Sequence, residues 1–186
     1  MFQVGTTSYV LKVRLSNYIT KELLGEFYLK FVHINGNSRR PQPLPDWYVS
    51  RFADIVENQG RLPTMPSVPD MPEDAYSTTV LTRFSDLDTN QHVTTIQYFK
   101  FFTDCATEAV FTKYYTHFTH DMCWYPVMAF DEAMLGESKA GEILTVRTWQ
   151  DKSDATHVFF ACFKDWKCVM KALCSQFNTK GTNTTI

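Results

Sequence analysis

The chain has 186 residues, with 18 Lys and Arg against 20 Asp and Glu and a formal net charge of −2. This length predicts one domain, or one domain and part of another. The near-neutral balance gives no electrostatic reason to expect a nucleic-acid partner, and no apolar run approaches the ~20 residues that span a bilayer. Aromatic residues make up 15% of the chain, with 15 Phe. This richness favours a β-rich fold or an aromatic core around an apolar ligand.

The cysteines indicate a reducing compartment. There are 5 of them, an odd count with no repeated spacing, and Cys162, Cys168 and Cys174 lie in apolar, strand-like segments. We therefore expect buried, reduced thiols in an intracellular protein, in the cytosol or an organelle lumen. The chain also enters a strand pattern almost at once, which leads us to expect a truncated or partial chain.

The first part of the chain, residues 1–57, predicts a β-hairpin followed by a short helix. Apolar and charged residues alternate in YVLKVRL, and the hairpin is expected over 9–34. The proline-rich stretch SRRPQPLP ends the second strand, and Asp46 is expected to cap a helix over 47–58. Prolines at every third position then predict a stiff linker over 58–75, although a docking site for a proline-recognition domain is the alternative.

After the linker the pattern predicts one strand, one long amphipathic helix and about four antiparallel strands. Such an order implies an α+β fold in which a curled antiparallel sheet wraps around one helix. The last two strands are expected to join through a tight turn at Lys164-Asp165, and the tail over 179–186 is expected to be disordered. The predicted strands cover 77–84, 126–133, 142–149, 155–163 and 166–177, and the predicted helix covers 94–115.

The most informative segment is RFSDLDTNQHVTTIQYFKFF, residues 83–102. Polar side chains recur there at every second position and lead directly into the predicted helix. A helix N-terminus offers unpaired N–H groups and a partial positive charge, which can stabilise a developing oxyanion. The segment therefore predicts a site that contains Asp86, Asp88, Asn90 and His92.

Two other interpretations of this segment compete. The D-x-D-x-N spacing opens a calcium loop, but Gln91 stands where such a loop needs Gly and Gln97 where it needs Glu. Alternatively, Asn90 or Thr94 caps the helix and His92 is a buried structural residue. The residues alone leave this second interpretation open.

Residues 83–102 resemble the SDLDxNxHVNNxxY signature of the acyl-acyl-carrier-protein thioesterases, which are double hot-dog proteins. The stretch over 34–46 is also similar to the end of that family's first repeat, and the likeness extends over about 20–178. The resemblance implies that residues 1–57 are the remnant of a first hot-dog repeat. It also implies that residues 76–178 form a complete hot-dog domain.

Two features depart from the family pattern. Thr94 and Thr95 replace the usual pair of asparagines, at the helix start, where capping is retained. The family's later Glu-Cys pair falls on Glu137 and Ser138 when the sequences are aligned without a gap. A shifted alignment would instead place Met134 and Leu135 there, and the site would lose its carboxylate.

The resemblance implies hydrolysis of fatty acyl thioesters of an acyl carrier protein or coenzyme A, without a cofactor. Asp88 would orient Asn90 and His92, and Asn90 with the helix amides would polarise the thioester carbonyl. His92 or Glu137 would activate water as the general base. The substrate would contact a pocket beside the helix, and the residues expected there are Phe99, Phe102, Thr94, Thr95 and Ser138.

The competing function is a hot-dog module that binds acyl chains or a protein partner without hydrolysis. A single hot-dog sheet leaves an exposed edge, so we also expect a homo-oligomer. Two further motifs are weaker. The H-x-x-H-x-x-C spacing of His117, His120 and Cys123 is reminiscent of a metal site but has no fourth ligand. The sequence GESKA misses the serine-hydrolase elbow at its last glycine.

Overall fold

The computed structural model describes residues 1–58, 60–64 and 67–175. The chain divides into two compact units, Met1–Thr64 and Met65–Ile186, and each is described by itself. This division falls within the segment predicted as a linker. The tail predicted over 179–186 lies outside the described residues. Among the described residues, no helix has both the length and the apolar character needed to cross a membrane.

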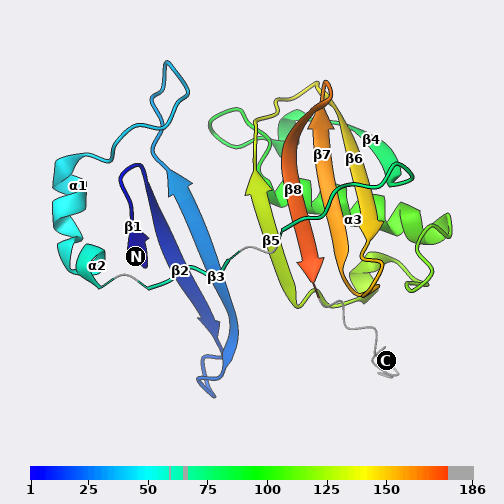
Figure 1. Cartoon of the computed structure of the whole chain (residues 1–186), viewed down its shortest axis with the longest axis horizontal. Helices are drawn as coiled ribbons and strands as arrows, with labels where there is room; N and C mark the ends of the chain where they lie inside the picture. Colours follow the sequence, from blue (N-terminus) through cyan, green and yellow to red (C-terminus); the bar gives the residue numbers. More distant parts are fainter. Residues whose placement is uncertain (59, 65–66, 176–186) are drawn as a thin grey trace. The chain divides into compact units, whose positions relative to one another are not determined.

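The first unit contains a three-stranded antiparallel sheet (Figure 1). One face of this sheet is strongly apolar. Tyr9 opposes Phe31 and Val13 opposes Phe27 in the pairing, and opposed residues of antiparallel strands share a face. The Tyr9 and Phe31 rings stack with centroids 5.1 Å apart, whereas Val13 and Phe27 remain exposed. In spatial order the three strands are β1 (Gln3–Val4), β2 (Ser8–Ser16) and β3 (Leu23–Val32).

Two short helices, α1 (Asp46–Arg51) and α2 (Ala53–Glu57), stand where one helix capped by Asp46 was predicted. Phe52 separates them, because its backbone leaves the helical region at φ −119° and ψ 28°. The predicted cap is also wrong. Pro45 occupies the N-cap position, and Asp46 is the first helical residue, where its charge complements the helix dipole.

The second unit is a five-stranded antiparallel sheet with α3 (Thr95–Phe111) across one face (Figure 1). The predicted α+β architecture of a sheet around one main helix is confirmed. Two short 3-10 turns, Phe84–Asp86 and Met122–Trp124, flank the helix along the chain. In spatial order the strands are β4 (Tyr76–Leu81), β6 (Ile143–Gln150), β7 (Val158–Lys164), β8 (Lys167–Ser175) and β5 (Ala129–Met134).

The main core lies between this sheet and α3. Phe102 of the helix stacks on Phe160 of β7 with ring centroids 4.9 Å apart, and both side chains are almost fully buried. Residues three and four apart on the helix face the sheet, as the sequence spacing predicted. The buried helix residues are Tyr98, Phe101, Phe102, Cys105, Ala106, Ala109 and Val110.

The helix ends at Phe111, four residues before the predicted end. Lys113 adopts a left-handed backbone conformation with φ 63°, and the N–H of Tyr114 donates to the carbonyl of Ala109 at 2.9 Å. Such a C-terminal motif usually contains Gly at the left-handed position. Because Lys113 carries no such signal, the sequence extended the helix too far.

The opposite face of the sheet carries a smaller core around Trp149 and Phe159. Val68, Met71 and Ala75 pack against it, although the sequence placed them in the linker. The second unit therefore includes the end of that segment.

Strands β7 and β8 join through a two-residue turn at Asp165 and Trp166, whose φ angles are 46° and 68°. Two positive φ angles define a type I′ hairpin turn. The predicted turn at Lys164-Asp165 was thus displaced by one residue, because Lys164 still pairs with Lys167.

Candidate active site

A short loop before α3 is organised by the Asp88 carboxylate. Its Oδ1 accepts hydrogen bonds from the backbone N–H of Asn90 at 2.8 Å and of His92 at 3.1 Å. The side-chain amide of Asn90 donates to Oδ2 at 3.4 Å. The N–H of Asp88 in turn donates to the carbonyl of His92 at 2.8 Å. The Asp88 side chain therefore holds Asn90 and His92 of the predicted site in a closed turn.

The charge of Asp88 is stabilised by this geometry. The backbone N–H of His92 makes the largest contribution that lowers the pKa of Asp88 below its ordinary value. Asp86 has a different task, because its carboxylate accepts the N–H of Arg83 at 2.7 Å and its carbonyl accepts the N–H of Thr94 at 3.0 Å. Asp86 thus anchors the entry to the helix.

Thr94 occupies the N-cap of α3, but its side chain makes no capping hydrogen bond. The expectation that Thr94 or Asn90 caps the helix through its side chain is therefore wrong. The N–H groups of Thr95 and Ile96 have no partner within the helix, because they belong to its first turn. The helix start thus directs polar N–H groups and a partial positive charge toward the loop of Asp88.

The imidazole of His92 meets a carboxylate from a distant part of the chain. Its Nε2 lies 3.2 Å from Oε2 of Glu137, and the two side chains are 20% and 49% exposed. Glu137 follows the end of β5, where the N–H groups of Leu135 and Gly136 both donate to the carbonyl of Val169, at 2.8 and 3.0 Å. Two residues opposite one form a β-bulge, which redirects the chain that carries Glu137.

The neighbouring Ser138 connects the two segments. Its carbonyl accepts the N–H of Val93 at 2.8 Å, so the backbones beside His92 and Glu137 are joined directly. The Ser138 side chain is fully buried, and its hydroxyl has no hydrogen-bond partner of acceptable geometry among the described residues. Tyr98, one turn into α3, is buried beside it, and this burial raises the pKa of Tyr98 to about 12.

The thiols of this unit are poor nucleophiles. Burial raises the pKa of Cys105, Cys162 and Cys174 to about 12, and it also raises the pKa of Cys168. The carboxylate of Asp121 raises the pKa of Cys123. With a raised pKa, all five cysteines are protonated at neutral pH. The thiolate is the reactive form, so none of them is an activated nucleophile.

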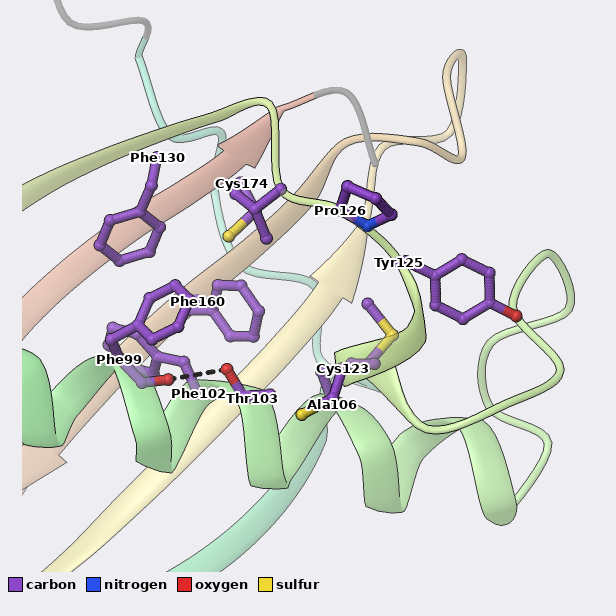
Figure 2. A pocket seen from close by; sticks show the side chains of 12 residues that line it. Phe99, Phe102, Thr103, Ala106, Cys123, Tyr125, Pro126, Phe130, Phe160 and Cys174 are labelled. Carbon is purple, nitrogen blue, oxygen red and sulfur yellow. Dashed lines mark hydrogen bonds between the residues drawn. The ribbon is translucent and has the colours of Figure 1, made fainter. Parts of the chain in front are cut away.

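An apolar cavity of about 320 Å³ lies beside the middle of α3. Figure 2 shows Phe99 and Phe102 from the helix facing Phe130 and Cys174 from the sheet. The sequence predicted the helix side of this cavity but not the wall formed by 122–127, where the spacing that includes Cys123 suggested only a metal site. The lining residues are Phe99, Phe102, Thr103, Ala106, Met122, Cys123, Tyr125, Pro126, Val127, Phe130, Phe160 and Cys174.

The predicted residues thus fall into two groups along α3, one at its start and one beside its middle. Asp88, Asn90, His92 and Glu137 gather before its N-terminus, with Thr94, Thr95 and Ser138 around its first turn. Phe99 and Phe102 line the cavity farther along. Within the part of the chain that the structure describes, no three His, Cys, Asp or Glu side chains come together in a way that could hold a metal ion.

Comparison with known proteins identifies the fold. The five-stranded sheet around α3 is a hot-dog fold, and thioesterases are among the solved structures that superpose on the chain. The 12:0-ACP thioesterase from Umbellularia californica superposes with a TM-score of 0.72 at 17% identity, over 92% of this chain and 63% of that one. An acyl-ACP thioesterase from Bacteroides thetaiotaomicron gives a TM-score of 0.70 at 16% identity, over 94% of this chain and 65% of that one.

Residues 70–119 match the family described as the acyl-ACP thioesterase C-terminal domain. The resemblance seen in the sequence is confirmed over this segment, and solved acyl-ACP thioesterases share the fold of the chain. It spans less than two thirds of the length of the two solved thioesterases. No curated protein matches the sequence.

Proposed function

We propose that this protein hydrolyses fatty acyl thioesters, with the acyl group carried by an acyl carrier protein or by coenzyme A. The observation that carries the proposal is the 3.2 Å approach of His92 and Glu137 at the start of the helix whose side borders an apolar cavity. A thioester carbonyl placed at the helix start would leave its acyl chain free to follow α3 toward Phe99 and Phe102.

In the proposed reaction, water attacks the thioester carbonyl carbon. His92 or Glu137 accepts a proton from this water as the new C–O bond forms, and their contact keeps the proton within the pair. The carbonyl oxygen gains negative charge, which Asn90 and the N–H groups at the start of α3 stabilise. The C–S bond then breaks, and the thiolate of the carrier takes a proton as the free acid leaves.

Water is the proposed nucleophile because neither Ser138 nor any of the five cysteines is activated to compete with it. Ser138 stands at the position that matches the family's cysteine, and its hydroxyl is buried. The pKa of each cysteine is raised, so none provides a thiolate at neutral pH. A general base, by contrast, typically contributes ~10²–10⁴-fold to such a step.

The purified chain tests this proposal with a panel of acyl-CoA and acyl-carrier thioesters. We expect release of free fatty acid and thiol in equal amounts from at least one carrier class. Replacement of Asp88 by Ala should reduce the rate without loss of the fold, because the loop that positions His92 would lose its acceptor.

The alternative is an acyl-binding module without turnover. The observation that favours it is the departure of Thr94, Thr95 and Ser138 from the family signature, combined with a cavity that suits an acyl chain. Tight binding of fatty acids with no hydrolysis of any thioester in the panel would support the acyl-binding module and contradict the proposed hydrolysis.

A further inference from the structure

A carboxylate that the sequence did not predict lies in the middle of β5. Glu132 opposes Ala172 of β8, between the pair of Phe130 with Cys174 and the pair of Met134 with Met170. Opposed residues share a face, and all three β8 residues belong to the core packed against α3. The Glu132 side chain therefore lies on the helix-facing side of the sheet.

This carboxylate is unusually poorly satisfied. Its Oε2 is buried and has no hydrogen-bond partner among the described residues. Burial alone raises the pKa of Glu132 to about 7. A buried polar atom without a partner destabilises the fold, so an acid at this position among apolar side chains requires an explanation. Its neighbours on the helix-facing side of the sheet, Phe130 and Ala172, are apolar.

The position of Glu132 along β5 relates this carboxyl to the cavity and to the proposed catalytic pair. Phe130 contacts Phe99 of α3 with ring centroids 4.9 Å apart, and both line the cavity. Glu132 lies two residues, or ~7 Å, beyond Phe130 along the strand. The chain then continues from Glu132 to Glu137 of the proposed catalytic pair, over a span of at most ~17 Å. Along the chain, Glu132 thus lies between Glu137 of the proposed reaction centre and Phe130 of the cavity wall.

An acyl chain that starts at the His92–Glu137 pair and ends in the cavity would pass Glu132. A saturated chain offers this carboxyl nothing to bond and would leave it desolvated. A hydroxyl group on the chain would satisfy it in either protonation state, because a hydroxyl donates to a carboxylate and accepts from a carboxylic acid. An oxo group could bond the protonated acid only.

We propose that Glu132 is a specificity-determining residue that selects hydroxylated acyl thioesters, by a hydrogen bond between its carboxyl and a hydroxyl on the acyl chain. This inference rests on the proposed function and deepens it by naming the substrate class. It makes Glu132 the polar contact of an otherwise apolar acyl site, the arrangement by which such pockets usually fix orientation.

The test compares hydroxyacyl-CoA thioesters with unsubstituted acyl-CoA of the same chain length, with the hydroxyl either at carbon 3 or near mid-chain. We expect kcat/KM for at least one hydroxylated substrate to exceed that of its unsubstituted counterpart at least ~10-fold, because a site built to bond a hydroxyl rejects the analogue that lacks it. Glu132→Leu should abolish this preference. Glu132→Gln, whose amide still donates and accepts, should retain most of it.

Asp131 provides the matched control, since its carboxyl lies next along the same strand and on the opposite face. Asp131→Leu should leave the preference unchanged. Equal use of hydroxylated and unsubstituted substrates by the wild type, or an unchanged preference in Glu132→Leu, would overturn the inference.

A binding measurement separates failure of this inference from failure of the proposed function. Free hydroxy fatty acids and their unsubstituted counterparts are titrated into the full chain by calorimetry. At least ~10-fold tighter binding of one hydroxy acid, lost in Glu132→Leu, would support the role of Glu132 even if no thioester were hydrolysed. Equal affinities would refute that role even if hydrolysis were observed.

Discussion

The pH dependence of stability tests the environment of Glu132 directly. Its pKa is raised from an ordinary value of 4.5 to about 7 by burial. A carboxyl with a raised pKa in the folded state binds its proton more tightly there than in the unfolded chain. Its favourable contribution is fully present below pH 4.5 and is lost as the pH rises through 7. We therefore expect the chain to lose stability between pH 5 and pH 8 through this group.

The size of the effect follows from the same values. A difference between 4.5 and about 7 corresponds to at most about 3 kcal/mol. The side chain is only half-buried, so solvent screening reduces this ceiling to ~1–2 kcal/mol. Glu132→Gln removes the titration, and the variant should gain that amount relative to the wild type between pH 5 and pH 8.

The assay is urea unfolding at a series of pH values, followed by tryptophan fluorescence. Trp149, which is buried in the second unit, reports on the unfolding of that unit. Asp88→Asn is the control. Backbone hydrogen bonds lower the pKa of Asp88, so its contribution is lost only as the pH falls below its ordinary value of 3.8. Its curve should parallel that of the wild type between pH 5 and pH 8. A Glu132→Gln curve that is also parallel to the wild type would refute the reasoning.

Three further predictions concern packing, backbone and association. Phe102→Ala should lower the free energy of unfolding by ~3–5 kcal/mol, because Phe102 is 1% exposed; a loss below 1 kcal/mol in urea unfolding would contradict this. Trp166→Gly should raise the free energy of unfolding by ~1 kcal/mol, because Asp165-Gly suits the type I′ turn, and an unchanged or lower thermal midpoint would argue against it. The exposed apolar face around Val13 and Phe27 should make the chain self-associate, and Phe27→Glu should weaken this; a monodisperse wild-type monomer by light scattering at all concentrations would exclude it.

The sequence predicted the architecture of the second unit because its patterns are local. The three- and four-residue spacing that ends in Ala109 and Val110 marked one face of α3, and the alternation in β6 marked a strand. The end of the helix was not predictable, because Lys113 takes a left-handed conformation that Gly normally signals. The turn at Asp165 and Trp166 was misplaced for the same reason.

The candidate site was likewise predictable from local sequence only in part. The loop around Asp88 lies within one short segment, and its polar pattern was visible. The approach of Glu137 to His92 depends on a β-bulge and on a hydrogen bond from Val93 to Ser138, neither of which leaves a signal in local sequence. The role of Glu132 was hidden because Asp131 precedes it, so alternation alone does not tell which of the two carboxyls faces the helix.

In the proposed reaction, His92 and Glu137 act together in the hydrolysis of an acyl thioester. The most direct test measures kcat/KM for the best acyl thioester with the wild type, His92→Ala and Glu137→Gln, each shown to be folded by circular dichroism. Glu108→Gln, an exposed glutamate on the same helix, serves as the control and should match the wild type. We expect each of the two site variants to lose at least ~10²-fold, as removal of a general base or its partner requires. Wild-type turnover by both variants would contradict the catalytic roles of His92 and Glu137.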